Sequence, residues 1–398
     1  MTFGIGRFEG EWGEIVRLLE MAFSSPWTEA QVEGVRPLWE PARSFVATDG
    51  REVVAHTSAF SLELTAPGAR VPVAGVSMVA TSPTHRRRGL VRQLMRRQLT
   101  ELCEGDGEAV AALTASEPVI YGRFGYGLAS DHQHVVVPRA SRELRRIAGV
   151  EDVRIRFADP VESLAVCTDL HNAEVPTRPG MFPLDERWQR VLVVDAHQAS
   201  PLRCVLAERD GEVIGYAYYR AQRADGGYVE VTRVHARDLA AHVALWQFLL
   251  DQDLLSETRY ERLPSDDPLL SLLLDVRAAG VKTQDGLWVR LADVGRALAA
   301  RTYSTEVDVV LGIEDDLLPW NAGSWHLAGG PEGATCEKTG ATPDLLLDVR
   351  DLGAVYLGRP SLALLGASGL VAEQTSGALG TTSRAFLADR LPWLDTGF

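Results

Sequence analysis

One stretch, residues 75–99, constrains this 398-residue chain more than any other. It reads as an apolar strand, a Ser-Pro turn, three consecutive arginines, one glycine and an amphipathic helix. After Gly89 the apolar residues recur on one helical face and the arginines fall outside it, so the glycine stands where the helix begins. Backbone N–H groups at a helix start lack partners and carry the positive end of the helix dipole. The stretch therefore predicts a binding site, which we call the anion seat, for an anion such as a phosphate.

Two other interpretations of this segment stay open, a solvated basic helix start and a patch that binds nucleic acid. The formal net charge of the chain is −14. Because phosphate backbones require a broadly basic face, this charge argues against a nucleic-acid partner. An acidic surface instead favours polycationic or amine substrates through long-range attraction.

A second informative segment covers residues 109–127. A buried strand is expected to end at Ser116, a residue type that caps helix N-termini well, and Glu117 and Pro118 follow in the first turn of a helix. The segment continues through Tyr121 to Gly125 and Tyr126.

Together the two segments resemble the motifs of GCN5-related N-acetyltransferases (GNAT). Arg86-x-x-Gly89-x-Val91 resembles the R/Q-x-x-G-x-G/A loop that holds the pyrophosphate of acetyl-CoA, although Val91 stands where the family has Gly or Ala. Residues 121–126 resemble the Y-x-x-x-G-F segment, in which the tyrosine protonates the departing thiolate. Tyr121 takes that position, and Tyr126 takes the position of a packing aromatic. Two motifs in the family's order and spacing are far more specific than either alone.

The cysteine pattern and the N-terminal sequence indicate in which cellular compartment the protein is expected. The four cysteines, at positions 103, 167, 204 and 336, are scattered, without a C-x-x-C pair or a histidine spacing that suggests a metal site, so no metal is expected. The N-terminus lacks a signal pattern, and no apolar run approaches the roughly 20 residues that span a bilayer. We expect no membrane span and a cytoplasmic location.

Residues 12–23 have a helical pattern, and residues 24–41 then carry Trp27, Glu29 and Trp39. In acetyltransferases this region borders the acceptor site, and a lining of tryptophan and carboxylate suits a cationic amine. The alternative is that both tryptophans belong to the core and that the glutamate is an ordinary surface residue.

A partial internal repeat follows. Residues 44–65 predict a hairpin around Asp49-Gly50, which leads into the central strand and its helix. Residues 201–252 show the same order of strands and helix. There, residues 235–238 (His-Ala-Arg-Asp) replace the arginines and glycine, so the second copy should not bind CoA.

Beyond residue 280 the pattern changes to a third α+β unit. Strands are expected near residues 307–314, 324–328 and 335–339, and helices near 351–357 and 361–365. This unit resembles a sterol-carrier-like domain.

The whole chain resembles the Eis (enhanced intracellular survival) family of N-acetyltransferases. The resemblance implies a mixed α/β fold with a catalytic GNAT domain at residues 1–148 and a degenerate GNAT-like domain at 149–284. A sterol-carrier-protein-like domain at 285–398 would follow, with its tail reaching the active site. It also implies acetyl transfer from acetyl-CoA to primary amines, such as aminoglycosides, polyamine-like amines or lysine side chains, in a homohexamer.

Residues carried over from the family fall into three groups. Tyr121 is the expected general acid, and the terminal carboxylate of Phe398 is the expected general base. The expected acetyl-CoA contacts are Val79, Ala80, Thr81, Arg87, Arg88, Gly89, Leu90, Val91, Arg92, Ser116 and Glu117. The expected substrate contacts are Trp27, Glu29 and Trp39.

Two rival functions remain for comparison. One is a non-catalytic regulator that binds CoA or a lipid on a GNAT scaffold, although the presence of Tyr121 weighs against it. The other is a hydrolase, for which the chain has neither a G-x-S-x-G nor an H-E-x-x-H motif.

Overall fold

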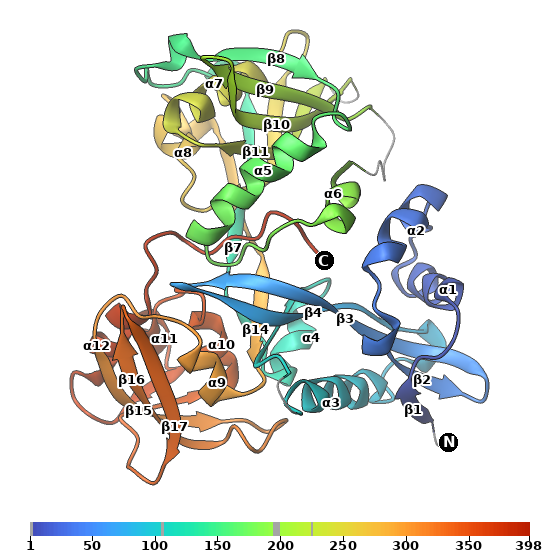
Figure 1. The fold of residues 1–398 in the computed structure, drawn as a ribbon, viewed down its shortest axis with the longest axis vertical. Coiled ribbons are helices and arrows are strands. Elements are labelled where there is room, and N and C mark those ends of the chain that lie inside the picture. Colours follow the sequence, from blue (N-terminus) through green and yellow to red (C-terminus); the bar gives the residue numbers. More distant parts are fainter. Residues whose placement is uncertain (1–2, 105–106, 194–199, 224–225) are drawn as a thin grey trace. The chain divides into compact units, whose positions relative to one another are not determined.

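Two compact units make up the chain in the computed structural model (Figure 1), which describes residues 3–104, 107–193, 200–223 and 226–398. Unit 1 consists of Met1–Ser130, Arg178–Phe182 and Asp285–Phe398. Unit 2 consists of Asp131–Thr177 and Pro183–Gln284. The domain boundaries near residues 148 and 284 stay predictions.

Unit 1 contains a seven-stranded sheet in the order β1-β2-β3-β4-β5-β14-β6. Only β4 and β5 run parallel, and the other neighbouring pairs are antiparallel. The strands are β1 (Gly4–Arg7), β2 (Phe45–Asp49), β3 (Glu52–Ala66), β4 (Ala69–Thr81), β5 (Val110–Thr114), β6 (Gly127–Leu128) and β14 (Leu287–Leu291). The hairpin predicted for residues 44–65 is confirmed as β2 and β3.

Helices cover both faces of this sheet. Side chains of α1 (Trp12–Phe23) pack with Val46, whereas side chains of α3 (Leu90–Leu102) pack with Ala47. Because successive strand residues point to opposite faces, the two helices lie on opposite sides. The bounds of α1 and the start of α3 directly after Gly89 are as predicted. Two shorter helices, α2 (Glu29–Val35) and α4 (Pro118–Tyr121), complete this part.

The neighbours of two strands differ from the sequence prediction. Residues 285–293 were assigned to the third domain, but β14 pairs with β5 and β6 in the first sheet. Residues 131–138, assigned to the first domain, form β7 (Asp131–Pro138) in the sheet of unit 2. An apolar pattern identifies a strand without identifying its partners, which long-range contacts decide.

The C-terminal part of unit 1 has its own five-stranded sheet, in the order β17-β16-β15-β18-β19. All three predicted strands are confirmed, and a helix that was not predicted, α12, forms within the polar stretch near residue 380. The elements are α9 (Val294–Ala299), β15 (Val307–Glu314), β16 (Gly323–Gly330), β17 (Gly333–Thr339), β18 (Leu345–Asp348), α10 (Val349–Val355), α11 (Leu362–Ala367), β19 (Val371–Glu373) and α12 (Ala378–Phe386).

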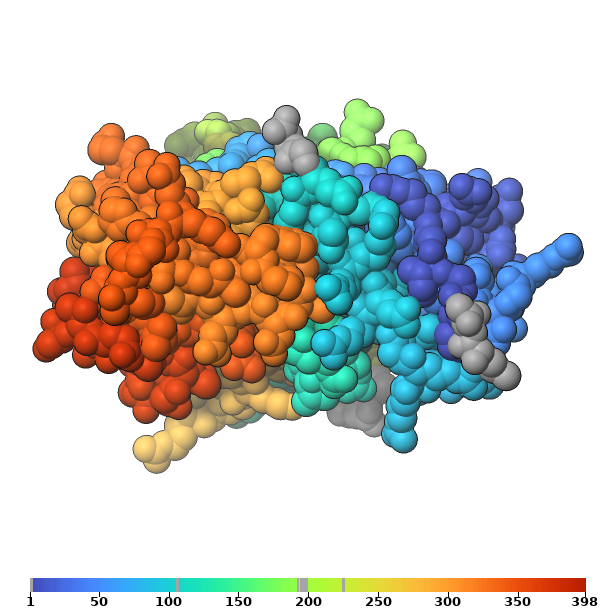
Figure 2. All heavy atoms as spheres, turned by 90° about the horizontal axis from the view of Figure 1, so that it is seen from below, coloured from blue at the N-terminus to red at the C-terminus, as the bar shows by residue number. Residues whose placement is uncertain are grey.

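The C-terminal part of unit 1 is hydrogen-bonded to the region of the first sheet. The N–H of Thr302, between α9 and β15, donates to the carbonyl of Pro67, between β3 and β4, at 2.9 Å. Figure 2 shows the cyan and orange parts of the chain, which belong to these two regions, in continuous contact.

Unit 2 repeats the order of the first sheet, as predicted from residues 201–252. Its sheet has the order β13-β7-β12-β11-β10-β9-β8, with β11 and β12 parallel in the way that β4 and β5 are. The further elements are β8 (Arg154–Ala158), α5 (Leu164–Glu174), α6 (Glu186–Val193), β9 (Arg203–Arg209), β10 (Glu212–Gln222), β11 (Tyr228–Ala236), α7 (Leu239–Leu250), β12 (Glu257–Pro264), α8 (Leu269–Leu272) and β13 (Gly280–Asp285).

Among the described helices of both units, none combines the length and the apolar character needed to cross a membrane.

Candidate active site

The turn before α3 has the geometry of an anion seat. Gly89 adopts a left-handed conformation (φ 76°) at the N-cap of α3, and Arg87 does so two residues earlier (φ 63°). No side chain caps this helix, and a Cβ placed on Gly89 would meet no atom within 4 Å. The backbone N–H groups of the first turn are therefore approachable by a ligand.

The arginines around this turn divide into two groups. Arg86 donates to the carbonyl of Ala22 at 2.8 Å, and Arg88 donates to the carbonyl of Thr84 at 3.3 Å. These two help to hold the turn in place. Arg87 and Arg92 are exposed and form no hydrogen bond or ion pair with any described residue. Their guanidinium groups are free to bind a phosphate.

Some predicted acetyl-CoA contacts can act only through the backbone. Leu90 and Ala80 are almost fully buried, at 2% and 4% exposure, and pack in the core. Val91, which departs from the family loop, is half-buried against the apolar cluster that contains Met95. The polar N–H groups of these residues remain the parts that could face a ligand.

The end of β4 is irregular next to this turn. Met78 has a positive φ of 53°, and the β3–β4 register shifts there, so Met78 and Val79 together oppose Thr57. β5 pairs with β4 only from Val73 to Gly75. Residues 79–81 thus lie beyond the part of β4 that pairs with β5. This part of the strand edge is therefore suited to bind a ligand through its backbone.

The segment after β5 carries the predicted acid. The strand ends at Thr114, and Glu117 is the N-cap of α4, so the prediction that Ser116 caps this helix is wrong. Ser116 is instead exposed, and its side chain acts on Tyr121 by partly opposing the rise in pKa that burial causes in that residue. Pro118 at the helix start favours the observed boundary, because its fixed φ suits a first helical residue.

Tyr121 is 5% exposed. Burial raises its pKa, and the side chain of Ser116 opposes this shift in part. Its hydroxyl is therefore protonated at neutral pH. Tyr126 is fully buried, and its ring meets that of Tyr121 edge to face at 6.2 Å. Its hydroxyl has no partner among the described residues, which agrees with the packing position expected for it.

The chain end reaches the same place from far along the sequence. Thr114 Oγ1 donates a hydrogen bond of 2.9 Å to the main-chain oxygen of Phe398, 284 residues later. The Phe398 ring packs against Phe182 at a centroid distance of 6.0 Å. A Cβ on Gly75 would lie 2.5 Å from Leu62 Cδ1 and 3.2 Å from that ring, so the missing side chain of Gly75 makes room for both. Sequence reasoning did not identify Thr114 or Gly75.

A short segment of unit 1, Arg178–Phe182, guides the tail. Trp393 N–H donates to the carbonyl of Pro179 at 2.9 Å, and the guanidinium of Arg178 lies 5.7 Å from the centre of the Trp393 ring. Met181 and Gly180 in turn exchange backbone hydrogen bonds with Thr65 on β3. The tail is therefore bound to the first sheet through this segment.

Predicted substrate contacts lie near the irregular part of β4. Trp27 and Trp39 are half-buried, and both pack on Trp12, with ring centroids 6.3 and 5.1 Å away. Glu29 is exposed in the first turn of α2. Both tryptophans join the cluster that contains Ala80, so they contribute to the core, and a role in acceptor binding stays a prediction.

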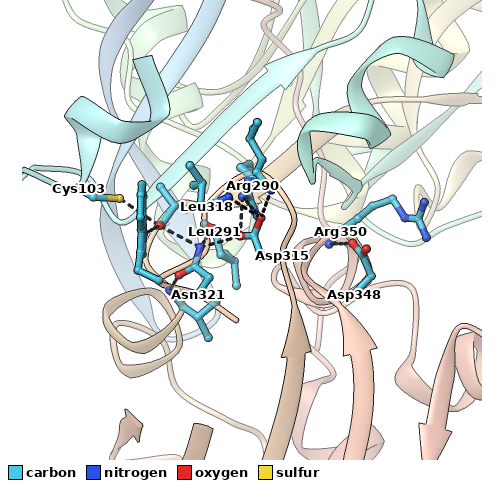
Figure 3. A network of polar contacts seen from close by, with 12 residues as sticks. Cys103, Arg290, Leu291, Asp315, Leu318, Asn321, Asp348 and Arg350 are labelled. Carbon is cyan, nitrogen blue, oxygen red and sulfur yellow. Dashed lines mark hydrogen bonds and ion pairs between the residues drawn. The ribbon is translucent and has the colours of Figure 1, made fainter. Parts of the chain in front are cut away.

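A buried ion pair supports the tyrosine segment from the C-terminal region (Figure 3). Arg290 Nη2 of β14 donates to both carboxylate oxygens of Asp315, at 2.8 and 2.6 Å, and Asn321 donates to the same carboxylate at 3.0 Å. A Cβ on Gly125 (φ 80°) would lie 2.7 Å from Arg290 Nη1, so only glycine fits beside the guanidinium. The sequence did not predict this network, because its residues lie far along the chain from both predicted motifs.

Comparisons with known proteins agree with this arrangement. Residues 8–129 and 180–291 match two acetyltransferase (GNAT) domain models, and residues 294–395 match a sterol carrier protein domain model. A protein named as an uncharacterized N-acetyltransferase of Streptomyces avermitilis is 45% identical over 93% of both chains.

Named Eis proteins are also similar. N-acetyltransferase Eis of Mycobacterium tuberculosis is 34% identical over 86% of this chain and 85% of its own length. The crystal structure of Eis1 from Mycobacterium abscessus superposes with a TM-score of 0.85 at 31% identity, covering both chains fully. The two GNAT folds, the sterol-carrier-like domain and these relatives show that the chain belongs to the Eis family of acetyl-CoA-dependent N-acetyltransferases.

Proposed function

We propose that this enzyme transfers the acetyl group of acetyl-CoA to a primary amine by direct attack, with Tyr121 as general acid and the terminal carboxylate of Phe398 as general base. One observation carries the proposal. The end of Phe398 accepts a hydrogen bond from Thr114 at the end of β5, and the chain that follows β5 carries Ser116, which partly opposes the burial that raises the pKa of Tyr121, and then Tyr121 itself. This arrangement supports a site in which a proton donor and a proton acceptor work together.

The seat for the CoA pyrophosphate would be the start of α3. Its N–H groups, together with the free guanidinium groups of Arg87 and Arg92, supply positive charge toward the phosphates. Arg88, Ser116 and Glu117 would add further contacts. In the second copy, Asp238 caps α7 by accepting from Ala241 N–H at 2.9 Å. A carboxylate thus occupies the place of Gly89, which explains why no second seat is expected.

An ammonium substrate must lose a proton before its nitrogen can attack. A terminal carboxylate has an ordinary pKa of about 3.5, so it is ionised at neutral pH and can accept that proton directly or through water. As the N–C bond forms, negative charge develops on the acetyl oxygen. Backbone N–H groups at the irregular end of β4, around Val79, would stabilise this charge.

The C–S bond then breaks, and the thiolate leaves. A thiol has an ordinary pKa of about 8.5, and the Tyr121 hydroxyl can donate its proton to the departing sulfur. An ammonium substrate loses two protons on its way to the amide. The first ends on the carboxylate, and the second passes from the nitrogen of the tetrahedral adduct to the tyrosinate that remains when the Tyr121 proton goes to the sulfur. The carboxylate then releases its proton to solvent, so the ammonium and acetyl-CoA give the amide, the free thiol and one proton.

The net charge of the chain indicates which class of acetyl acceptor it would attract. The chain carries 54 Asp and Glu against 40 Lys and Arg, which favours cationic acceptors such as aminoglycosides, polyamine-like amines or lysine side chains. A homohexamer and a cytoplasmic location remain part of the proposal.

A panel of amines with acetyl-CoA, monitored by release of free thiol, tests this function. We expect turnover with at least one polycationic amine, and strong loss of turnover in Tyr121→Phe. Binding of acetyl-CoA without thiol release for any amine would instead favour the non-catalytic CoA-binding regulator.

A further inference from the structure

The irregular end of β4 contains one peptide group whose orientation needs an explanation. Met78 and Val79 have no Cα partner of their own on β3, because both oppose Thr57. Met78 also holds a positive φ of 53°, which is unfavourable for a residue with a side chain. Something outside the strand ladder must therefore hold this peptide group.

His56 makes that contact. Its Nδ1 lies 2.9 Å from the carbonyl oxygen of Met78. A carbonyl can only accept a hydrogen bond, so Nδ1 carries the proton. His56 is 0% exposed, and burial lowers its pKa to about 4, so the ring is neutral at physiological pH. Its Nε2 is then an acceptor, and it has no partner among the described residues.

This arrangement is unusual for a residue that only fills space. A buried nitrogen without a partner destabilises a fold, and an apolar side chain of similar size would avoid that cost. The single bond that His56 does form goes to the strained peptide group. The side chain thus gives up one hydrogen bond while holding Met78.

In a trans peptide the C=O and the following N–H point in opposite directions. The hydrogen bond to the Met78 carbonyl therefore directs the Val79 N–H away from His56. We propose that His56 is a positioning residue that fixes the Met78–Val79 peptide group, so that the Val79 N–H faces the thioester oxygen of acetyl-CoA. This inference rests on the proposed acetyl transfer.

The test compares two replacements of His56. The amide nitrogen of Asn can occupy nearly the place of Nδ1, so His56→Asn can still donate to Met78, whereas His56→Leu cannot. We expect His56→Leu to lower kcat about tenfold or more, with the KM for the amine changed by less than about twofold. His56→Asn should stay within about threefold of the wild-type kcat.

A matched control lies next along the strand. Thr57 is also 0% exposed and donates one hydrogen bond of 3.0 Å, to Gln98 of α3. Thr57→Val removes a buried hydrogen bond without touching the Met78 carbonyl. Its melting temperature should fall, but its kcat should stay close to that of the wild type. Equal losses of kcat in Thr57→Val and His56→Leu would overturn the proposal.

A binding experiment separates failure of this inference from failure of the proposed reaction. A hydrogen bond from Val79 to the thioester oxygen should make acetyl-CoA bind about 2–10-fold more tightly than CoA in calorimetry. We expect His56→Leu to lose this preference and His56→Asn to keep it. The measurement needs no acceptor, so it stands even if no amine is acetylated.

The remaining outcomes also decide the question. A folded His56→Leu variant with wild-type kcat and wild-type preference for acetyl-CoA would refute the role of His56, as would equal affinity of the wild-type protein for both ligands. If His56→Leu does not fold, His56→Gln replaces it. The Gln amide lies one methylene further out, so Gln should fail where Asn succeeds, and identical behaviour of the two would overturn the proposal.

Discussion

Removing the carboxylate of Asp315 should strongly destabilise unit 1. Arg290 is 0% exposed, and Asp315 accepts hydrogen bonds from its guanidinium, from Asn321 and from the N–H groups of Leu317 and Leu318. Breaking a buried ion pair from one side costs about 3–5 kcal/mol, because the other charge stays buried without a partner. Since each kcal/mol changes Tm by about 2–4 °C in a domain of this size, Asp315→Ala should lower Tm by roughly 6–20 °C.

Scanning calorimetry measures this change, and a surface pair provides the control. Arg70 and Glu63 lie 3.4 Å apart with side chains 44% and 52% exposed, so Glu63→Ala should cost less than about 1 kcal/mol. Replacing both members of the buried pair with apolar residues (Arg290→Met, Asp315→Leu) should recover part of the lost stability. A Tm for Asp315→Ala that matches that of Glu63→Ala would show that the buried charge is compensated elsewhere.

Four further outcomes follow from the site. Gly89→Asp should abolish CoA binding in calorimetry while the protein stays folded, because a carboxylate would face the pyrophosphate. Unchanged affinity would show that the pyrophosphate does not bind at the start of α3. Tyr121→Phe should lower turnover far more than CoA binding, and full activity in Tyr121→Phe with loss in Tyr126→Phe would identify the other tyrosine as the acid. Residues added after Phe398 should abolish turnover but leave CoA affinity nearly unchanged, and normal turnover would remove the terminus from the mechanism. Burial lowers the pKa of His56 from 6.5 to about 4. Between these pH values the unfolded chain binds a proton more readily than the folded protein, so the free energy of unfolding should fall by up to about 3 kcal/mol as the pH falls from 6.5 toward 4. Denaturation at several pH values checks this, with His56→Asn for comparison.

Local features of the chain were readable from the sequence. The helix at residues 12–23 and the strand at 307–314 have the predicted bounds, because each carries its own periodicity of apolar residues. Gly89 marks the start of α3 for a similar reason, since a glycine before an amphipathic run has a local conformational meaning. Both motifs of the candidate site are of this local kind.

Features that depend on distant contacts were not readable in the same way. Nothing near β14 in the sequence shows that it pairs with β5 rather than with a strand of its own region. The prediction that Ser116 caps α4 is wrong because a residue type that caps helices well does not by itself fix where a helix begins. Proline prefers the first helical position, and Pro118 takes that position when Glu117 is the cap. Thr114 could not be identified either, since its role comes from a residue 284 positions away.

The proposed mechanism separates binding from turnover within one unit. The seat at the start of α3 needs only the first sheet and its helices, because Gly89, Arg87 and Arg92 all belong to one turn and one helix. Proton removal from the amine also needs the tail, which leaves α12, contacts Arg178–Phe182 and reaches β5. The third domain is therefore part of the catalytic apparatus in this proposal, since it delivers the chain end to the strand that also positions Tyr121. A chain that lacks only its last few residues should therefore still bind CoA and should no longer turn over.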